Sequence, residues 1–257
     1  MYWPVLFIIG VAVGSFINVL ATRYREDGRI FSADIISGRS RCDFCGQKLP
    51  WYELIPLISF LIQGGKCRHC HQRLTWQYPA VELITGLMFV FIPLYAAPAW
   101  IWLPAFAAIL LMSLIDMRLW IIPDQVNWFL VLLGSALVIN GAADGAWVSL
   151  AHSSLLGAMM AAAILGAIYL FTSEKGIGFG DVKLGIALGF LFGLPATLLI
   201  IAIAFVIGGA VATLLLLRGK KTMKEGMPFG QFLGLAAIIV LFFGGYILER
   251  YILYVQF

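Results

Sequence analysis

A glycine-rich segment that ends in a carboxylate is the first part of the sequence whose residue types and spacing could do chemistry. In Gly176-Ile177-Gly178-Phe179-Gly180-Asp181, three glycines lead into Asp181, and a long apolar run follows. A carboxylate at the edge of a membrane segment is energetically costly, which favours a functional role. Gly178 and Gly180 lack a Cβ, so an extended backbone can approach there. We assign Gly178, Gly180 and Lys183 to an active-site loop. The alternative is that Asp181 only caps the next helix.

The residues after Asp181 indicate which way its side chain points. Gly185, Gly189 and Gly193 recur at every fourth position. They therefore form a stripe of small residues on the helix face that also carries the aspartate. Such stripes allow membrane helices to pack closely. We expect Asp181 to face neighbouring helices and not lipid.

A second carboxylate, Asp116, lies at the end of an earlier apolar run. Three predicted membrane crossings separate it from Asp181, which places both at the same depth on the same side of the bilayer. Two adjacent carboxylates cannot both ionise cheaply, so one keeps a proton near neutral pH. Such a pair can activate water with one member and protonate the departing amide nitrogen with the other, as in aspartic proteases. The alternative is two unrelated aspartates, each paired with a nearby base such as Arg118 or Lys183.

Asp124 competes with Asp116 for the first place in this pair. It follows Pro123 and precedes another apolar run. Proline followed by an acidic residue is typical of a turn and a helix start, where the side chain accepts hydrogen bonds from unpaired backbone N–H groups. We therefore predict that Asp124 is the N-cap of the helix that follows.

All four cysteines of the chain fall in two Cys-x2-Cys pairs, and this doubled spacing is typical of a zinc site. The predicted ligands are Cys42, Cys45, Cys67 and Cys70. Four sulfur ligands complete a tetrahedral coordination sphere, so the Zn²⁺ ion would be structural and not catalytic. Two disulfides and unmetallated thiols are the alternatives, although disulfides are disfavoured in the reducing cytoplasm. His69 and His71 flank the last cysteine and are interpreted as loop residues.

The composition excludes a soluble domain of this length. The chain has 257 residues, of which 62% are hydrophobic and 12% are charged, with a mean hydropathy of +0.97. We predict an all-α polytopic membrane protein with about eight transmembrane helices, surrounded by the lipid bilayer. The apolar runs that would form them are 3–21, 80–97, 100–115, 126–140, 148–172, 182–195, 197–217 and 229–247.

The basic residues predict how the chain is oriented. With the amino terminus outside, every lysine and arginine except Arg250 falls on the inner side. The positive-inside rule then places both termini outside the cytoplasm and both aspartates at the cytoplasmic face. The basic run at 218–224 is interpreted as an anchor that touches anionic lipid, and no nucleic acid partner is expected.

Three parts of the chain follow from this pattern. Residues 1–21 form the first span, and residues 22–79, the only long polar segment, form a cytoplasmic zinc-binding module. Residues 80–257 form the transmembrane core that carries both aspartates.

The motifs, taken together and in order, resemble those of type IV prepilin peptidases, the bifunctional leader peptidases and N-methyltransferases of the GxGD aspartyl protease group. The resemblance covers nearly the whole chain, and its motifs are very specific. They are Gly14-Ser15-Phe16-Ile17-Asn18-Val19 with Arg23, the cysteine module with Trp51-Tyr52-Glu53-Leu54-Ile55-Pro56, Tyr78-Pro79-Ala80-Val81-Glu82-Leu83, Ile115-Asp116 with Ile122-Pro123-Asp124, the Gly176–Leu184 segment, and Pro228-Phe229-Gly230.

The resemblance implies a function and its location. Asp116 and Asp181 would be the catalytic pair of an enzyme in the bacterial cytoplasmic (inner) membrane. The enzyme would cleave prepilins or pseudopilins on the cytoplasmic side, after a glycine that ends a basic leader. It would then methylate the new amino terminus with S-adenosylmethionine. Our candidates near the methylation site are Asn18, Glu53 and Glu82. Each also has an ordinary interpretation: a packing hydrogen bond for Asn18, a loop charge for Glu53, and a partner of a loop arginine for Glu82.

The sequence departs from the family pattern at three positions. Asp43 and Gln231 stand where proline is usual, and Gln77 stands where arginine is usual. None of these departures touches the aspartates, whereas Gln77 bears on methylation, which rests on the resemblance alone. Two alternative functions stay open. One is a peptidase without methylation activity, and the other is a non-catalytic assembly or transport factor whose buried aspartates bind cations or relay protons.

Overall fold

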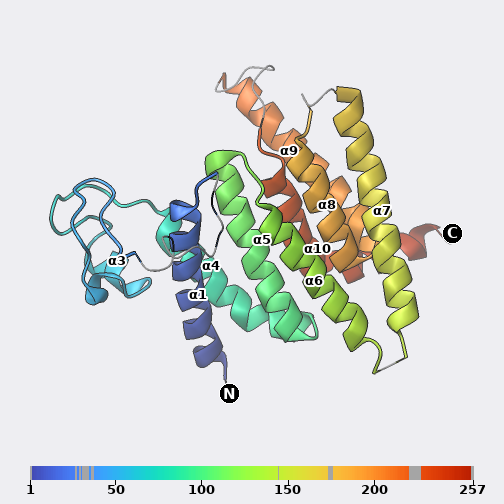
Figure 1. The fold of residues 1–257 in the computed structure, drawn as a ribbon, viewed down its shortest axis with the longest axis horizontal. Helices are drawn as coiled ribbons and strands as arrows, with labels where there is room; N and C mark the ends of the chain where they lie inside the picture. Colours follow the sequence, from blue (N-terminus) through green and yellow to red (C-terminus); the bar gives the residue numbers. More distant parts are fainter. Residues whose placement is uncertain are drawn as a thin grey trace. The chain divides into compact units, whose positions relative to one another are not determined.

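The computed structural model describes residues 2–26, 28, 30, 35, 38–143, 145–172, 176–219 and 227–255, and most of them are helical (Figure 1). The chain divides into two compact units, Met1–Leu94 and Tyr95–Phe257. Each unit has its own packing and its own cavity.

The first unit consists of two long helices and a polar module between them in the chain. Its elements are α1 (Trp3–Arg23), the 3₁₀ helix η1 (Trp51–Glu53), α3 (Ile58–Ile62) and α4 (Gln77–Tyr95). Glycines bring α1 and α4 together. A Cβ at Gly10 would lie 2.7 Å from the Cβ of Phe89, and one at Gly14 would lie 2.9 Å from the Cα of Glu82. Because only glycine fits, the two backbones pack at short range.

The second unit is a bundle of six helices. They are α5 (Ala99–Leu119), α6 (Asp124–Asn140), α7 (Trp147–Thr172), α8 (Phe179–Phe192), α9 (Leu194–Leu217) and α10 (Gly230–Val255). The short helix α8 lies at the centre and packs against α6, α7, α9 and α10. A helix surrounded in this way is apolar on all sides, so α8 shows no polar face in the sequence.

The glycine stripe of α8 is used for packing, as predicted. A Cβ at Gly189 would lie 2.7 Å from the carbonyl carbon of Gly157 on α7, and one at Gly193 would lie 2.5 Å from the Oγ of Ser153. Gly185 is likewise buried, against Leu165. Asp181, at the start of the same helix, is only 6% exposed. The prediction that it faces the bundle is therefore confirmed.

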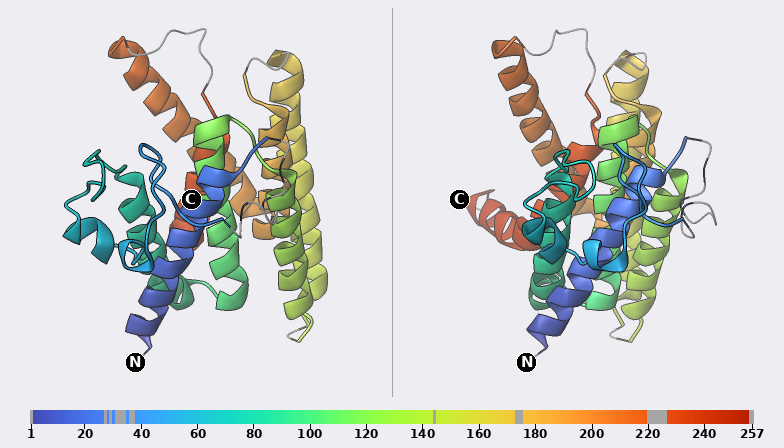
Figure 2. Two further views of the ribbon diagram at one scale, coloured as in Figure 1. Left: turned by 60° about the vertical axis from the view of Figure 1, so that its left-hand side comes forward. Right: turned by 90° about the vertical axis from the view of Figure 1, so that its left-hand side faces the viewer.

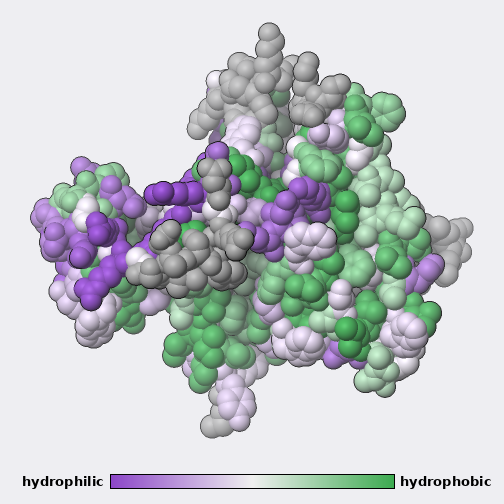
Figure 3. Space-filling model, in the orientation of Figure 1, coloured by the Kyte–Doolittle hydropathy of each residue, from purple (hydrophilic) through white to green (hydrophobic). Residues whose placement is uncertain are grey.

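The predicted fold class is confirmed. Each of the eight predicted apolar runs coincides with one long helix of the described chain. Six of these helices are long and apolar enough to cross a membrane; α6 and α8, with 17 and 14 residues, are shorter. The count of eight crossings stays a prediction. Apolar side chains dominate the face of the bundle formed by α6 and α7, whereas the polar module is largely hydrophilic (Figure 3).

The helices of the second unit alternate in direction. The ends of α5, α7 and α9 and the starts of α6, α8 and α10 therefore gather at one end of the bundle (Figures 1 and 2). Asp116 is in the last turn of α5 and Asp181 in the first turn of α8. The alternation thus brings the two aspartates, which are far apart in sequence, to the same end.

We predict that Gly157→Ala destabilises the bundle, because the added Cβ would overlap the carbonyl oxygen of Gly189 and lie 2.8 Å from the carbonyl carbon of Gly193. Overpacking of this kind costs about 1–3 kcal/mol. Gly166→Ala on the same helix is the matched control, because a Cβ there would have no atom within 4 Å. Thermal unfolding in detergent should show a lower midpoint for Gly157→Ala alone. Equal midpoints for the two variants would contradict the close contact of α7 with α8.

Candidate active site and metal centre

Asp116 is buried where α5 ends. It lies in the last turn of the helix, and the helix ends at Trp120, which has the left-handed backbone conformation with φ of 60°. The residue is 3% exposed. One carboxylate oxygen, Oδ2, accepts a hydrogen bond of 3.2 Å from the backbone N–H of Gln231, in the first turn of α10. A buried carboxylate needs such partners, because unpaired burial is costly.

Asp181 is held by the start of its own helix. Gly178 is the N-cap of α8, and its backbone N–H donates a hydrogen bond of 2.9 Å to Asp181 Oδ2. The aspartate therefore does cap the helix, as the structural alternative predicted. This role does not exclude a second one, because the hydrogen bond orients the carboxylate and leaves Oδ1 to face the bundle interior.

The two carboxylates face one point in space. A Cβ placed on Gly230 would lie 3.0 Å from Asp116 Oδ2 and 3.3 Å from Asp181 Oδ1. Both aspartates line a cavity of about 130 Å³ at the same end of the bundle. Its other lining residues are Trp120, Ile122, Gly178, Gly180, Met227, Pro228 and Phe229. The predicted pair is thus brought together, with both predicted loop glycines beside it.

Lys183 and Asp124 form an ion pair with each other. Lys183 Nζ lies 2.8 Å from Asp124 Oδ1 and 3.0 Å from Oδ2, and neither residue lines the cavity. Lys183 therefore pairs with neither aspartate of the buried pair. The prediction that Asp124 is an N-cap is wrong by one residue: Pro123 is the N-cap, and α6 begins at Asp124. Pro123 occupies the N-cap position, so the Asp124 side chain does not cap the helix and instead binds Lys183.

The arrangement of the pair allows acid–base chemistry on a small group. The cavity has room for water beside two carboxylates, and its remaining walls are mostly apolar side chains and glycine backbone. A low-polarity enclosure strengthens interactions between charged groups and a reacting carbonyl. The site can therefore move protons between water and a bound group that enters beside Gly178 and Gly180.

The four cysteines of the first unit form one cluster. Their sulfur atoms all lie within 4.8 Å of one another, and the four cysteines are not disulfide-bonded. Two matching turns build the cluster: Cys42 N–H donates to the carbonyl oxygen of Gln47, and Cys67 N–H donates to that of Gln72. Neither His69 nor His71 belongs to this group among the described residues. The cluster can hold a metal ion with the four predicted ligands.

One thiol of the cluster ionises more readily than usual. Hydrogen bonds from the backbone N–H groups of Cys70 and His69 lower the pKa of the Cys67 thiol from 9.0 to about 7. The thiolate is the form that binds metal. The turn that places Cys67 therefore also prepares it as a ligand.

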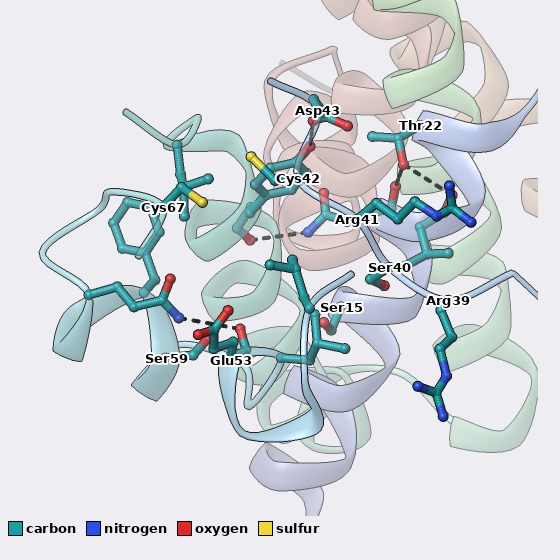
Figure 4. A pocket seen from close by; sticks show the side chains of 18 of the residues that line it. Ser15, Thr22, Arg39, Ser40, Arg41, Cys42, Asp43, Glu53, Ser59 and Cys67 are labelled. Carbon is teal, nitrogen blue, oxygen red and sulfur yellow. Dashed lines mark hydrogen bonds between the residues drawn. The ribbon is translucent and has the colours of Figure 1, made fainter. Parts of the chain in front are cut away.

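A larger cavity, of about 370 Å³, lies within the first unit (Figure 4). A volume of this size suits a cofactor or a small-molecule ligand. Among its lining residues are all three predicted methylation candidates, Asn18, Glu53 and Glu82, and two of the cysteines, Cys42 and Cys67. Arg23, Arg39 and Arg41 contribute positive charge to the same cavity. Candidates from three separate segments of the sequence thus converge on one site.

The polar groups of this cavity are unequally satisfied by the described residues. Glu82 accepts a hydrogen bond of 2.7 Å from the backbone N–H of Leu57, and no arginine among the described residues forms an ion pair with it. Asn18 Nδ2 donates to the carbonyl oxygen of Tyr78, but Asn18 Oδ1 is buried without a partner. Glu53 Oε2 is also buried without a partner, and Glu53 is 7% exposed, so it is not a loop charge in solvent. Two acceptors are therefore available to a ligand.

Comparison with known proteins decides the family. The bacterial Peptidase A24 N-terminal domain matches residues 8–96, and the type IV leader peptidase family matches residues 102–213. The chain belongs to the type IV leader peptidase family. With six helices that could span a membrane, this membership indicates a bacterial inner-membrane protein.

Relatives in this family match over most of their length. A protein of Burkholderia pseudomallei (strain K96243) is 33% identical over 92% of this chain and 84% of its own. Proteins of Aeromonas hydrophila and Bacillus subtilis (strain 168) are each 30% identical, over 98% and 96% of this chain and 94% and 97% of their own. All three are named prepilin leader peptidase/N-methyltransferase. No solved structure matches the chain significantly.

The family site includes residues that the sequence did not assign. Pro228-Phe229-Gly230 was noted as a motif without a role, and Gln231 only as a departure from the family pattern. The structure places Gly230 and Gln231 against the two carboxylates. The expectation that no departure from the family pattern touches the aspartates is therefore wrong for Gln231, whose backbone N–H binds Asp116. A glycine at a predicted helix start was the one available signal, because it leaves space for a close neighbour.

Proposed function

We propose that this protein removes the basic leader of type IV prepilins or pseudopilins, after glycine, and then N-methylates the new amino terminus. The observation that carries the proposal is the meeting of two buried carboxylates, Asp116 and Asp181, in one cavity. The family supports it, since relatives named prepilin leader peptidase/N-methyltransferase match over most of the chain.

In the proposed cleavage, the two aspartates share one proton. The ionised carboxylate takes a proton from water as the water oxygen attacks the scissile carbonyl carbon. The protonated carboxyl donates its proton to the departing amide nitrogen, whose bond to that carbon then breaks. The hydrogen bonds from Gly178 and Gln231 hold the carboxylates during these transfers.

The cavity walls favour an extended peptide as substrate. Gly178 and Gly180 present backbone without side chains on one side of the carboxylates. Phe229 and Ile122 supply apolar surface. An extended backbone that continues into a hydrophobic helix can place its peptide bond against glycine and its apolar side chains against these walls.

The cytoplasmic face is the proposed location of cleavage. Arg118, Lys183 and Arg218 lie in helix ends at the same end of the bundle as the aspartates. Positive residues collect on the cytoplasmic side of membrane proteins. Both termini would then lie outside the cytoplasm, and a leader rich in lysine and arginine would remain on the inner side.

For methylation, we propose that the cavity of the first unit holds S-adenosylmethionine. The residues present fit this cofactor: the volume is sufficient, Glu53 and Asn18 offer unpaired acceptors, and arginines supply positive charge. Glu53 and Asn18 would bind the amino group of the cofactor, and Arg39 or Arg41 its carboxylate. When bound, the cofactor supplies an electrophilic methyl group. Glu82, fixed by Leu57, would help to shape the wall.

We propose Zn²⁺ as the ion of the cysteine cluster. Four sulfurs at about 2.3 Å from one zinc ion in a tetrahedron are about 3.8 Å apart. The sulfurs of Cys42 and Cys70 are 3.8 Å apart. Because Cys42 and Cys67 also line the cavity, a structural zinc would hold residues 22–79 in the shape that the cofactor needs.

A non-catalytic transport or assembly factor is the second hypothesis. Buried aspartates can also relay protons or bind cations in membranes. Ion binding requires a group of several oxygen ligands, whereas here the carboxylates meet backbone N–H donors, which a cation would repel. The donors therefore favour the peptidase.

We predict that Asp116→Asn and Asp181→Asn each abolish cleavage of a model prepilin, because either change removes one half of the acid–base pair. The loss should be at least about a thousandfold in kcat. Asp124→Asn is the control and should cleave normally, since Asp124 lies outside the cavity. Activity in Asp116→Asn with loss in Asp124→Asn would mean that Asp124 is the first member of the pair.

We predict that Glu53→Gln weakens binding of S-adenosylmethionine by about tenfold or more, because it removes the negative charge that faces the amino group. Equilibrium dialysis measures this without any turnover. Glu26→Gln, at an exposed carboxylate of the same unit, is the matched control. Equal affinities for the two variants would place the cofactor elsewhere. Cleavage should be unchanged in both.

We predict about one zinc ion per purified chain, lost in Cys67→Ser and retained in His69→Ala, as measured by metal analysis. Because binding requires thiolates, zinc affinity should fall as the pH is lowered from about 8 to about 6. Disulfides found after reducing purification, or metal retained by Cys67→Ser, would contradict the site.

A further inference from the structure

We infer that the start of α10 positions the catalytic aspartates, and that Gly230 is the residue on which this depends. The inference rests on the proposed function of Asp116 and Asp181 and adds a third element to their site. It concerns orientation of the carboxylates, so Gly230 is a positioning residue that does not contact substrate.

The space around Gly230 is closed by the reacting groups. A Cβ there would lie 3.0 Å from Asp116 Oδ2, 3.3 Å from Asp181 Oδ1 and 2.8 Å from Ile122 Cδ1. All three distances are shorter than the optimal contact of about 3.5–4.0 Å. The space that a Cβ on Gly230 would need is therefore already bordered by both carboxylates. Any side chain at this position would push on at least one of them.

The start of α10 lies against both aspartates and gives one of them a hydrogen-bond donor. N–H groups in the first turn of a helix have no partner within the helix. Here the N–H of Gln231 donates to Asp116 Oδ2 at 3.2 Å, and Gly230 lies so close to Asp181 that a Cβ on it would be 3.3 Å from Oδ1. The start of α10 thus holds the carboxylate from α5 by a hydrogen bond and packs against the carboxylate from α8. The positive end of the helix dipole also stabilises the negative charge on the pair.

The register of α10 along α5 fixes this arrangement. One turn after Gly230, a Cβ at Gly234 would lie 2.6 Å from Ser113 Oγ and 3.1 Å from Ile109 Cγ2, both on α5. Gly230 and Gly234 therefore lie on one face of α10, directed at Asp116 and at the turns that precede it. Leu233 and Ala237 are fully buried in the same segment. The helix cannot slide without losing this packing.

A displaced carboxylate would lose activity before the fold is lost. The φ of Gly230 is not in the left-handed region, so alanine is compatible with the backbone. Alanine would instead shift the aspartates or the helix by a few tenths of an ångström. Misplacement of a catalytic group by about 1 Å can cost about a hundredfold in rate. Gly230 itself does not line the cavity, so affinity for the prepilin should change less than the rate.

The test compares kcat and KM for prepilin cleavage in Gly230→Ala, in wild type and in Gly245→Ala. The last is a matched control on α10, because a Cβ there would have no atom within 4 Å. We expect kcat to fall by about tenfold to a hundredfold in Gly230→Ala, with KM within about twofold of wild type. A kcat equal to that of Gly245→Ala would overturn the inference.

The Ile122→Val substitution distinguishes the effect of contacts with the carboxylates from the effect of the contact with Ile122. Valine lacks the Cδ1 atom that gives the shortest contact, so Gly230→Ala combined with Ile122→Val leaves only the two carboxylate contacts. This double variant should still have a kcat at least about tenfold below Ile122→Val alone. Equal values would overturn the inference, even if Gly230→Ala alone does not fold. Failure of the proposed function would be seen differently, as cleavage by Asp181→Asn or no cleavage by wild type.

Discussion

The burial of two carboxylates among apolar helices is the constraint on which the bundle depends. A buried charge needs hydrogen-bond donors, and in an apolar bundle the unpaired backbone N–H groups at helix starts can supply them. The starts of α8 and α10 meet at Asp116 and Asp181 and provide N–H donors from Gly178 and Gln231. The alternating helix directions place these starts beside the end of α5. The site is thus a consequence of where helices begin.

Close packing follows from this requirement. For two helix starts to reach one pair of aspartates, α8 must lie deep within the bundle, and glycine is the residue that permits it. Gly189 meets Gly157 backbone to backbone, and Gly230 and Gly234 let α10 approach α5. Such interfaces have little conformational freedom, because no side chain can yield. The rigidity that membrane helices gain from small residues therefore also fixes the geometry of the two aspartates.

Much of the fold and part of the site could be predicted from the sequence. Apolar runs revealed all eight long helices, and cysteine spacing revealed the cluster, because both signals are local. Counting crossings predicted that Asp116 and Asp181 lie at the same depth on one side of the bilayer, and the family resemblance implied that they form a pair. The partners of the pair could not be found in this way, since Gln231 reaches Asp116 only through the register of α10 on α5. A proline, usual in the family at this position, has no N–H to donate. The pairing of Lys183 with Asp124 was missed because it too depends on how two helices pack against each other.

The two units stabilise their cavities in different ways. In the proposed function, hydrolysis needs carboxylates in an enclosed site, which the second unit would provide with its long apolar helices. Methyl transfer would need a cavity with free acceptors, and the first unit would provide it from a polar segment with few buried apolar residues among those described, such as Ile35 and Phe60. A segment with so small a core gains stability from a metal ion, because ligands that are scattered in the unfolded chain are joined on folding. The cysteine cluster beside Glu53 and Asn18 therefore takes the structural part that close helix packing takes around the aspartates.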